Sequence, residues 1–91
     1  MNYQEKIEEY RNEINRLNEE ILDKIEERVQ VARNIGEIKQ RYGKPIIDRE
    51  REDKVIEQVR KLAVERDLDP EKVSAIFKKI IDLCVEAEER L

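Results

Sequence analysis

Apolar side chains recur every three or four residues along most of the first half of this chain. The repeating positions form one stripe, which reads Ile7, Arg11, Ile14, Asn18, Ile21, Ile25, Arg28, Ala32, Ile35, Lys39 and Tyr42. Such spacing is typical of a helix that is buried along one face against other helices. Tyr10, Leu17 and Leu22 flank the stripe and widen it, as a globular core requires. The pattern predicts one long helix over about residues 4–42.

The length of this helix has a consequence for assembly. At 1.5 Å per residue, about 38 residues form a rod roughly 57 Å long. A compact domain of this size has a radius of gyration of only about 12 Å. The rod is therefore longer than a single compact domain, and part of its apolar stripe needs a second chain to cover it. We expect an intertwined helical homodimer in which the long helices contact each other.

A glycine and a proline end the first helix. Gly43 suits the position just after a helix, and Pro45 keeps the residue before it out of helical geometry. Residues 43–48 are therefore predicted to form a loop. Asp48 is a good N-cap for a second helix over about residues 49–66. The apolar positions expected on its inner face are Val55, Ile56, Val59, Leu62 and Ala63.

A second break follows at residues 67–69, where Asp69 is the expected N-cap and Pro70 the first helical residue. The third helix is predicted over about residues 70–90. Its apolar positions are Val73, Ile76, Phe77, Ile80, Ile81, Cys84, Ala87 and Leu91. The sequence thus predicts an all-α fold of three helices, the first very long, forming one domain over residues 1–91.

Composition narrows the possible functions. The net charge is −4 and both signs are interspersed, so nothing suggests a nucleic acid or an anionic membrane surface as a partner. No apolar run is long enough to span a membrane, and Met1 leads directly into polar sequence. The single cysteine fits a reducing cytoplasm. Histidine, a common general base and metal ligand, is absent, and we expect neither a metal nor a cofactor.

Three cations interrupt the apolar stripe of the first helix: Arg11, Arg28 and Lys39. A buried cation costs several kcal/mol unless an anion compensates it. Arg28 and Lys39 are about 16 Å apart along the axis and nearly in phase, so both can reach one small ligand. Arg11 lies about 25 Å from Arg28 and could approach such a ligand only from the second chain of a dimer. The alternative for Arg28 and Lys39 is a salt bridge to Glu52 or Glu88.

Polar residues also occupy apolar positions on the other two helices. Glu88 follows Cys84 by one turn on the stripe of the third helix, although a frayed terminal residue facing water is the alternative. Cys84 alone is more often a small core residue. Arg51 and Glu52 lie one turn before the apolar face of the second helix, where an ordinary first-turn ion pair is the alternative. Together these residues predict a strongly cationic pocket for a small dianion that carries a hydroxyl group.

This combination of residues resembles the all-helical chorismate mutases. The residues that carry the resemblance are Arg11, Arg28, Lys39, Asp48, Arg51, Glu52 and Glu88. The run Gly-Lys-Pro-Ile-Ile-Asp-Arg-Glu-Arg-Glu over residues 43–52 adds to it, as do Glu27-Arg28 and the segment Ile-Gly-Glu-Ile-Lys over residues 35–39. Each motif is weak alone, but their order and spacing over essentially the whole chain are specific. The resemblance implies an intertwined homodimer with two equivalent active sites, each completed by the first-helix arginine of the partner.

The activity implied by the resemblance is the isomerisation of chorismate to prephenate, on the route to phenylalanine and tyrosine. This [3,3] Claisen rearrangement is unimolecular and needs no metal, nucleophile or base. Catalysis consists of holding the compact conformer and stabilising charge on the breaking ether oxygen. By similarity, Arg28 and Arg11 of the partner subunit grip the substrate carboxylates, because arginine favours bidentate geometry. Lys39 contacts a carboxylate and the ether oxygen.

The resemblance also assigns roles to the remaining site residues. Glu52 and the backbone at Asp48 would hold the ring hydroxyl, and Arg51 would support the carboxylate side. Two positions depart from the family pattern. Cys84 replaces a residue that often carries a hydroxyl group and binds a carboxylate. Glu88 replaces a glutamine in many members, and it must be protonated to donate to the ether oxygen.

Two other functions fit the same sequence features. An isochorismate pyruvate lyase shares the fold and the class of ligand but performs an elimination. A non-catalytic helical dimerisation module would use the polar stripe residues as specificity devices. Convergence of these residues on one pocket argues against the module, and the products formed from chorismate and isochorismate distinguish the two enzymes.

Overall fold

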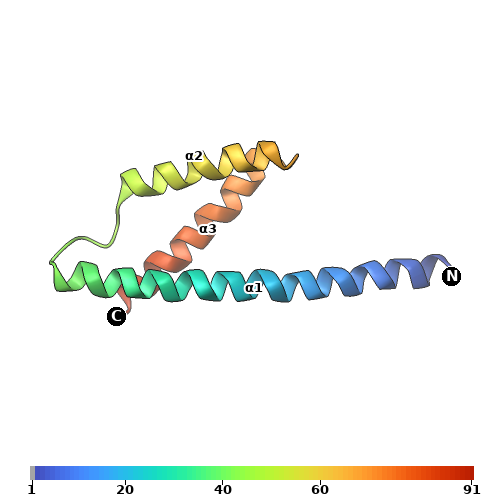
Figure 1. The fold of residues 1–91 in the computed structure, drawn as a ribbon, viewed down its shortest axis with the longest axis horizontal. Helices are drawn as coiled ribbons and strands as arrows, with labels where there is room; N and C mark the ends of the chain where they lie inside the picture. The colour runs from blue at the N-terminus through green and yellow to red at the C-terminus, as the bar shows by residue number, and fades with distance from the viewer. Residues whose placement is uncertain (1) are drawn as a thin grey trace.

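The computed structural model describes residues 2–91, and these residues form three α-helices without a strand (Figure 1). The helices are α1 (Tyr3–Arg41), α2 (Arg49–Glu65) and α3 (Pro70–Glu89). The predicted all-α fold with a very long first helix is therefore confirmed. Each helix ends one residue earlier than expected, and α1 also begins one residue earlier because Asn2 caps it. The side-chain oxygen of Asn2 accepts a hydrogen bond from the backbone N–H of Glu5 at 2.8 Å.

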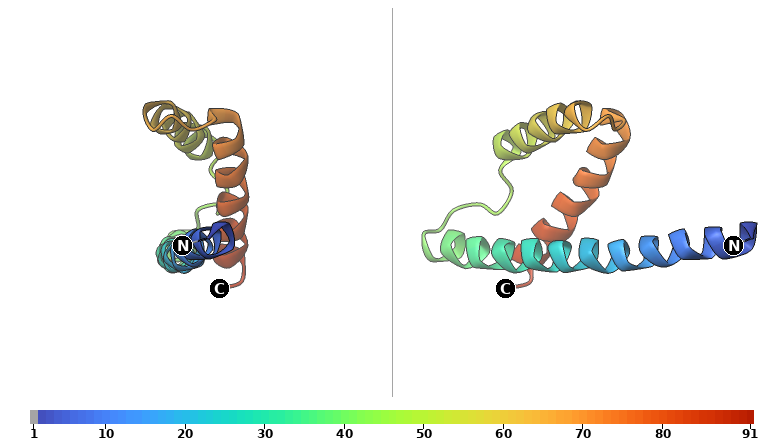
Figure 2. Two further views of the ribbon diagram at one scale, coloured as in Figure 1. Left: turned by 90° about the vertical axis from the view of Figure 1, so that its right-hand side faces the viewer. Right: turned by 45° about the vertical axis from the view of Figure 1, so that its right-hand side comes forward.

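The three helices form an open arrangement rather than a bundle. Helix α3 contacts both α1 and α2, whereas α1 and α2 have no contact with each other among the described residues. Figures 1 and 2 show α3 crossing from the end of α2 to the C-terminal half of α1. The N-terminal half of α1 extends away with no helix beside it. The chain measures 61 × 27 × 14 Å and its radius of gyration is 17.2 Å, well above the value of about 12 Å for a compact domain.

The apolar stripe of α1 is largely uncovered within one chain. Ala32 and Gly36 are the buried residues of this helix. Five large apolar side chains of its N-terminal half are 45–66% exposed, and they are Tyr10, Ile14, Leu17, Ile21 and Leu22. No helix of the described chain is both long enough and apolar enough to cross a membrane.

The core is small and lies along α3, where it contacts the other two helices. Its buried apolar residues are Ala32, Val59, Ala63, Ile81 and Cys84. Three residues predicted to lie on the inner faces of the second and third helices are exposed, Leu62 by 38%, Ile76 by 58% and the terminal Leu91 by 46%. Ile76 lies about 140° around α3 from Ile81, beyond the strip that α1 and α2 cover. Leu62 is exposed because α2 packs against one helix alone.

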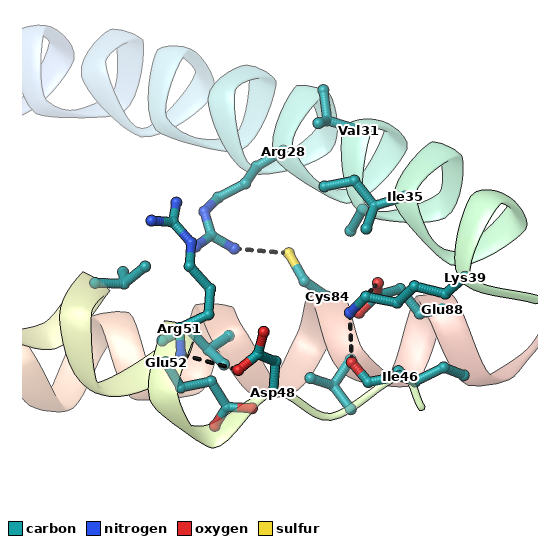
Figure 3. Close-up of a pocket in the computed structure, with 14 residues that line it drawn as sticks. Arg28, Val31, Ile35, Lys39, Ile46, Asp48, Arg51, Glu52, Cys84 and Glu88 are labelled. Carbon is teal, nitrogen blue, oxygen red and sulfur yellow. Dashed lines mark hydrogen bonds and ion pairs between the residues drawn. The ribbon is translucent and has the colours of Figure 1, made fainter. Parts of the chain in front are cut away.

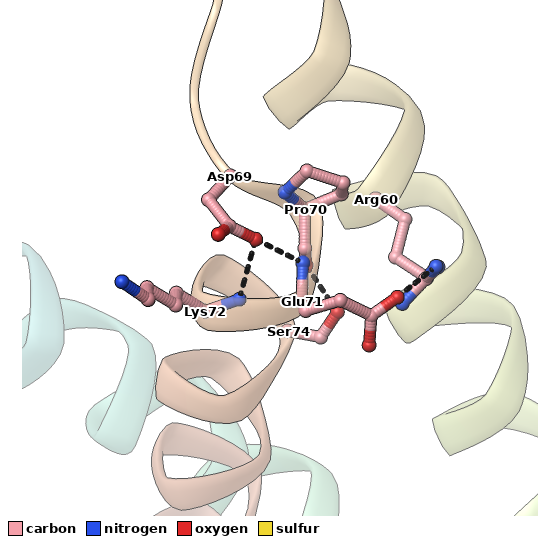
Figure 4. Close-up of polar contacts among 6 residues, drawn as sticks. All are labelled: Arg60, Asp69, Pro70, Glu71, Lys72 and Ser74. Carbon is pink, nitrogen blue, oxygen red and sulfur yellow. Dashed lines mark hydrogen bonds and ion pairs between the residues drawn. The ribbon is translucent and has the colours of Figure 1, made fainter.

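The corner between α2 and α3 is fixed by polar contacts (Figure 4). The carboxylate of Asp69 accepts a hydrogen bond from the backbone N–H of Glu71 at 2.9 Å, and Pro70 is the first residue of α3. The buried hydroxyl of Ser74 donates to the carbonyl of Pro70 at 2.6 Å. Arg60 of α2 forms an ion pair with Glu71 of α3. These contacts set the angle at which α3 returns to α1.

Candidate active site

A cavity of about 360 Å³ lies where α3 meets the C-terminal half of α1. Its wall is completed by the loop before α2 and by the first turns of α2 (Figure 3). Seven of the eight predicted site residues line it, namely Arg28, Lys39, Asp48, Arg51, Glu52, Cys84 and Glu88. The other seven lining residues are apolar, among them Ile35, Ile46 and Ile81. The structure therefore brings one helix-terminal loop and three helices to a single pocket.

Lys39 and Glu88 form the innermost polar contact. The Nζ atom of Lys39 lies 3.4 Å from Oε1 of Glu88, and the side chain of Glu88 is only 8% exposed. The same Nζ atom donates to the backbone carbonyl of Ile46 at 2.5 Å. The alternative in which Glu88 faces water is therefore wrong. The alternative salt bridge of Lys39 is present, but it lies inside the cavity and so belongs to the pocket.

Arg28 is held by a sulfur atom rather than by a carboxylate. Its Nη1 atom donates to Sγ of Cys84 at 2.9 Å, and the contact is partly buried. Among the described residues, Arg28 has no ion pair with Glu52 or Glu88. The thiol of Cys84 thus fixes the guanidinium at the edge of the pocket. In Figure 3 the guanidinium groups of Arg28 and Arg51 lie at one end of the cavity, and Lys39 lies with Glu88 at the other.

The N-terminal end of α2 forms one side of the pocket. Asp48 is its N-cap, and a carboxylate oxygen of Asp48 accepts from the backbone N–H of Arg51 at 3.1 Å. Glu52 is half-buried and Arg51 is exposed. No ion pair joins these two residues within the described chain, so the alternative first-turn pair is not observed. The positive end of the α2 dipole lies in the same wall and favours a bound anion.

The charge of the pocket differs from the prediction. Its cations are Arg28, Lys39 and Arg51, and its carboxylates are those of Asp48, Glu52 and Glu88. When all six groups are ionised, the formal charge contributed by one chain is zero. The prediction of a strongly cationic pocket is therefore wrong for a single chain. It emphasised the cations of α1 and gave too little weight to the acidic groups of α2 and α3.

Arg11 is the predicted site residue that the single chain does not bring to the cavity. It is exposed on the N-terminal half of α1, about 25 Å along the helix axis from Arg28. A straight helix cannot fold back over that distance. The contribution of Arg11 to a site on a second chain stays a prediction.

Two features of the site were missed by the sequence analysis. The carbonyl of Ile46 holds Lys39, and no side-chain pattern reveals a backbone acceptor. Gly36 is buried near the C-terminal end of α1, directly against Glu88. A glycine inside a helix costs about 1 kcal/mol relative to alanine. That cost is the signal by which a close helix contact at Gly36 could have been predicted.

The fold and pocket define an all-α protein with a cavity for a small ligand between its helices. A sequence model of the chorismate mutase type II family matches residues 10–89, and the chain belongs to this family. The chain is 37% identical over 78 residues to a chorismate mutase of Methanocaldococcus jannaschii, covering 86% of this chain and 79% of that protein. It is 36% identical over 90 residues to a bifunctional chorismate mutase/prephenate dehydratase of Aquifex aeolicus, covering 96% of this chain. The chain spans only 25% of that longer protein. The predicted family, and with it the class of enzyme, is confirmed.

Proposed function

We propose that this protein converts chorismate to prephenate in the cavity between α1, α2 and α3, in the cytoplasm and without a metal or cofactor. The observation that carries the proposal is the convergence of seven predicted side chains on one cavity of about 360 Å³ in a chain of this family. The volume suits one small ligand, and the free thiol of Cys84 fits a reducing compartment.

The shape of the cavity suits a unimolecular rearrangement. Chorismate must fold its enolpyruvyl side chain over its ring before the new C–C bond can form while the ether C–O bond breaks. Apolar walls from Ile35, Ile81 and Val85 restrict the bound substrate to such a compact shape. Holding reacting atoms at near-attack distance removes much of the entropic barrier.

The carboxylates of the substrate belong at the end of the cavity that holds Arg28 and Arg51. Arg28 is oriented by Cys84, so its remaining N–H groups are directed before the substrate arrives. Cys84 contributes to carboxylate binding through Arg28. Arg51 supports the same side of the ligand.

The breaking ether oxygen belongs at the opposite end, between Lys39 and Glu88. The Nζ atom of Lys39 and Oε1 of Glu88 are 3.4 Å apart, so both can reach one oxygen atom that lies beside the pair in the cavity. Negative charge grows on this oxygen as the C–O bond breaks, and fixed donors stabilise it. Lys39 donates in its charged form, whereas Glu88 donates only when it is protonated. Glu52 and the backbone at Asp48 hold the ring hydroxyl.

The charge of the pocket supports completion by a second chain. A pocket of zero formal charge has no net attraction for a dianion, and Arg11 of the partner subunit supplies one positive charge. We propose an intertwined homodimer in which each Arg11 reaches the cavity of the other chain.

The charge distribution along the chain supports an antiparallel arrangement of the two α1 helices. Within α1, residues 4–27 carry nine acidic and four basic side chains, whereas residues 28–41 carry one acidic and four basic ones. Antiparallel helices place the acidic half of one against the basic half of the other. The exposed apolar residues of both stripes are then covered together.

The direct test is to incubate the purified protein with chorismate in the presence of a chelator and identify the product by NMR. We expect prephenate at a rate far above the uncatalysed one. A parallel incubation with isochorismate should release no pyruvate. Release of pyruvate from isochorismate without prephenate formation would establish the lyase instead. Turnover of neither substrate would support a non-catalytic dimerisation module.

A further inference from the structure

Gly36 occupies a position on α1 where a Cβ atom would fit only if its neighbours on the C-terminal turn of the chain moved. A Cβ atom built there would lie 2.7 Å from Cδ1 of Leu91 and 3.1 Å from both Cβ and Cγ of Glu88. The first distance requires Leu91 to move, and the second is tighter than ordinary van der Waals contact. Glycine weakens the interior of a helix by about 1 kcal/mol relative to alanine. The close approach of the chain after α1 at this position is the physical reason why glycine suits it despite that cost.

The contact with Glu88 connects Gly36 to the charged end of the cavity. Gly36 and Lys39 are three residues apart and so lie on the same side of α1. The buried side chain of Glu88 runs over Gly36, and its Oε1 atom reaches to 3.4 Å from Nζ of Lys39. The distance between these two polar groups therefore depends on how closely α3 approaches α1 at Gly36.

We propose that Gly36 is a positioning residue for the reaction: its missing side chain sets the place of the Glu88 carboxyl group relative to the Lys39 ammonium at the breaking ether oxygen. This inference rests on the proposed function. An added methyl group would push the last turn of α3 outward by a few tenths of an ångström. Displacements of about 1 Å at a reacting centre can cost about 100-fold in rate.

The first test compares Gly36→Ala with the wild-type protein. We expect kcat to fall by about tenfold or more with little change in KM, because the atoms nearest to a Cβ at position 36 belong to Leu91 and Glu88 and not to Arg28 or Arg51. The melting temperature of Gly36→Ala should change much less than its activity, since alanine strengthens the helix. Asn34→Ala is the matched control. Asn34 is exposed, lies about 200° around α1 from Gly36, and its side-chain oxygen accepts a hydrogen bond from Gln30 of the same helix, so its replacement should leave kcat unchanged.

A double-mutant cycle identifies the side chain through which position 36 acts. In a Glu88→Ala background, Gly36→Ala should cost less than about threefold, because the side chain that it displaces is gone. An equal loss in both backgrounds would overturn the proposal, as would full activity of Gly36→Ala in an active wild-type background. An inactive wild-type protein would instead refute the proposed function.

A Leu91→Ala substitution distinguishes the effect of the contact with Leu91 from that of the contact with Glu88. It removes the tightest overlap and leaves the contact with Glu88, so the activity lost in Gly36→Ala should stay lost in Gly36→Ala/Leu91→Ala. Complete recovery would show that the terminal leucine alone causes the defect and would contradict the role of Glu88. If Gly36→Ala does not fold, the same cycle with Glu88→Ala is measured in the Leu91→Ala background, where the shortest contact is absent.

Discussion

The ammonium group of Lys39 is fixed by two oxygen atoms, a carboxylate oxygen of Glu88 at 3.4 Å and the carbonyl oxygen of Ile46 at 2.5 Å. Only 24% of its side chain is exposed. A lysine on the protein surface samples many rotamers, whereas this one is oriented in advance. Preorganised charge costs no reorganisation when the transition state forms, and its electrostatic effect is therefore large.

Replacing Lys39 by alanine should therefore reduce kcat/KM by about two to three decades. Loss of one preorganised donor at a developing charge typically costs about 2.7–4 kcal/mol. Steady-state kinetics and far-UV circular dichroism measure the activity and the helical content. Lys54→Ala is the matched control, because Lys54 forms an exposed ion pair with Glu50 and does not line the cavity. A loss of kcat/KM below about tenfold in Lys39→Ala would show that Lys39 does not stabilise the transition state.

Glu88 should make the reaction sensitive to pH. Its carboxyl group donates a hydrogen bond only while it carries a proton, so activity should decline as pH rises and the group ionises. Glutamine donates at every pH. In Glu88→Gln we therefore expect a flatter profile of kcat against pH and preserved activity at neutral pH. A profile with the same shape in both proteins would show that Glu88 does not donate to the substrate.

The site residues differ in how far the sequence could reveal them. Arg28, Lys39 and Glu88 interrupt helical apolar stripes, and a break in periodicity is visible without coordinates. The role of Cys84 in orienting Arg28 depends on a contact between residues 56 positions apart in sequence, which no local pattern encodes. For the same reason the formal neutrality of the pocket emerges only once α2 and α3 are placed against α1.

At the scale of the elements, the corner between α2 and α3 gives a stability prediction. The guanidinium of Arg60 donates a hydrogen bond to the carboxylate of Glu71 and attracts its negative charge, and both effects lower the pKa of that carboxyl group below its ordinary value. Because the pKa of Glu71 is lower in the folded state, the ion pair stabilises the fold at pH values above the pKa that Glu71 has in the unfolded chain. This stabilisation is lost as pH falls through the lowered pKa. Both side chains are well exposed, so the effect should be small and reduced by salt.

We therefore expect Arg60→Gln to lower the melting temperature slightly at neutral pH and not at all once Glu71 is protonated in acid. Thermal unfolding of both proteins over a pH series measures the difference. Lys61→Gln is the control, because Lys61 is the neighbouring exposed cation and has no ion pair among the described residues. A deficit in Arg60→Gln that persists unchanged in acid would exclude the ion pair as its cause.

Helix boundaries followed from the sequence because their signals are local. Asp48 and Asp69 cap α2 and α3 as predicted, and Gly43 adopts the positive φ of 64° that favours glycine after a helix. The inward faces were less predictable. Apolar periodicity identifies the side of a helix that is buried but not the width of the strip that a neighbour covers. Leu62 and Ile76 are therefore exposed although both fit the pattern.

At the scale of the whole molecule, the single chain is incomplete as a folded unit. Its longest dimension is 61 Å, and most of the apolar stripe on the N-terminal half of α1 faces solvent. The same half carries the one predicted site residue that is absent from the cavity, Arg11. In the proposed homodimer, the second copy of the chain would cover this stripe and would bring its Arg11 to the site.

The shared site is tested most directly by mixing two inactive variants. Homodimers of Arg11→Ala and of Arg28→Ala should each have very low activity. Every site then lacks one arginine that binds a substrate carboxylate, a contact that contributes about 1.5–3 kcal/mol. When the two variants are unfolded and refolded together, about half of the dimers should contain one chain of each. One site of such a dimer carries both substitutions, and the other carries neither.

The measurement is the chorismate mutase activity of the refolded mixture relative to an equal amount of wild-type protein refolded in the same way. Random pairing predicts recovery to about one quarter of the wild-type activity, because one site in four regains both arginines. If Arg11 and Arg28 served one site within a single chain, no pairing could restore an intact site. Activity no greater than the mean of the two separate variants would contradict the shared active site.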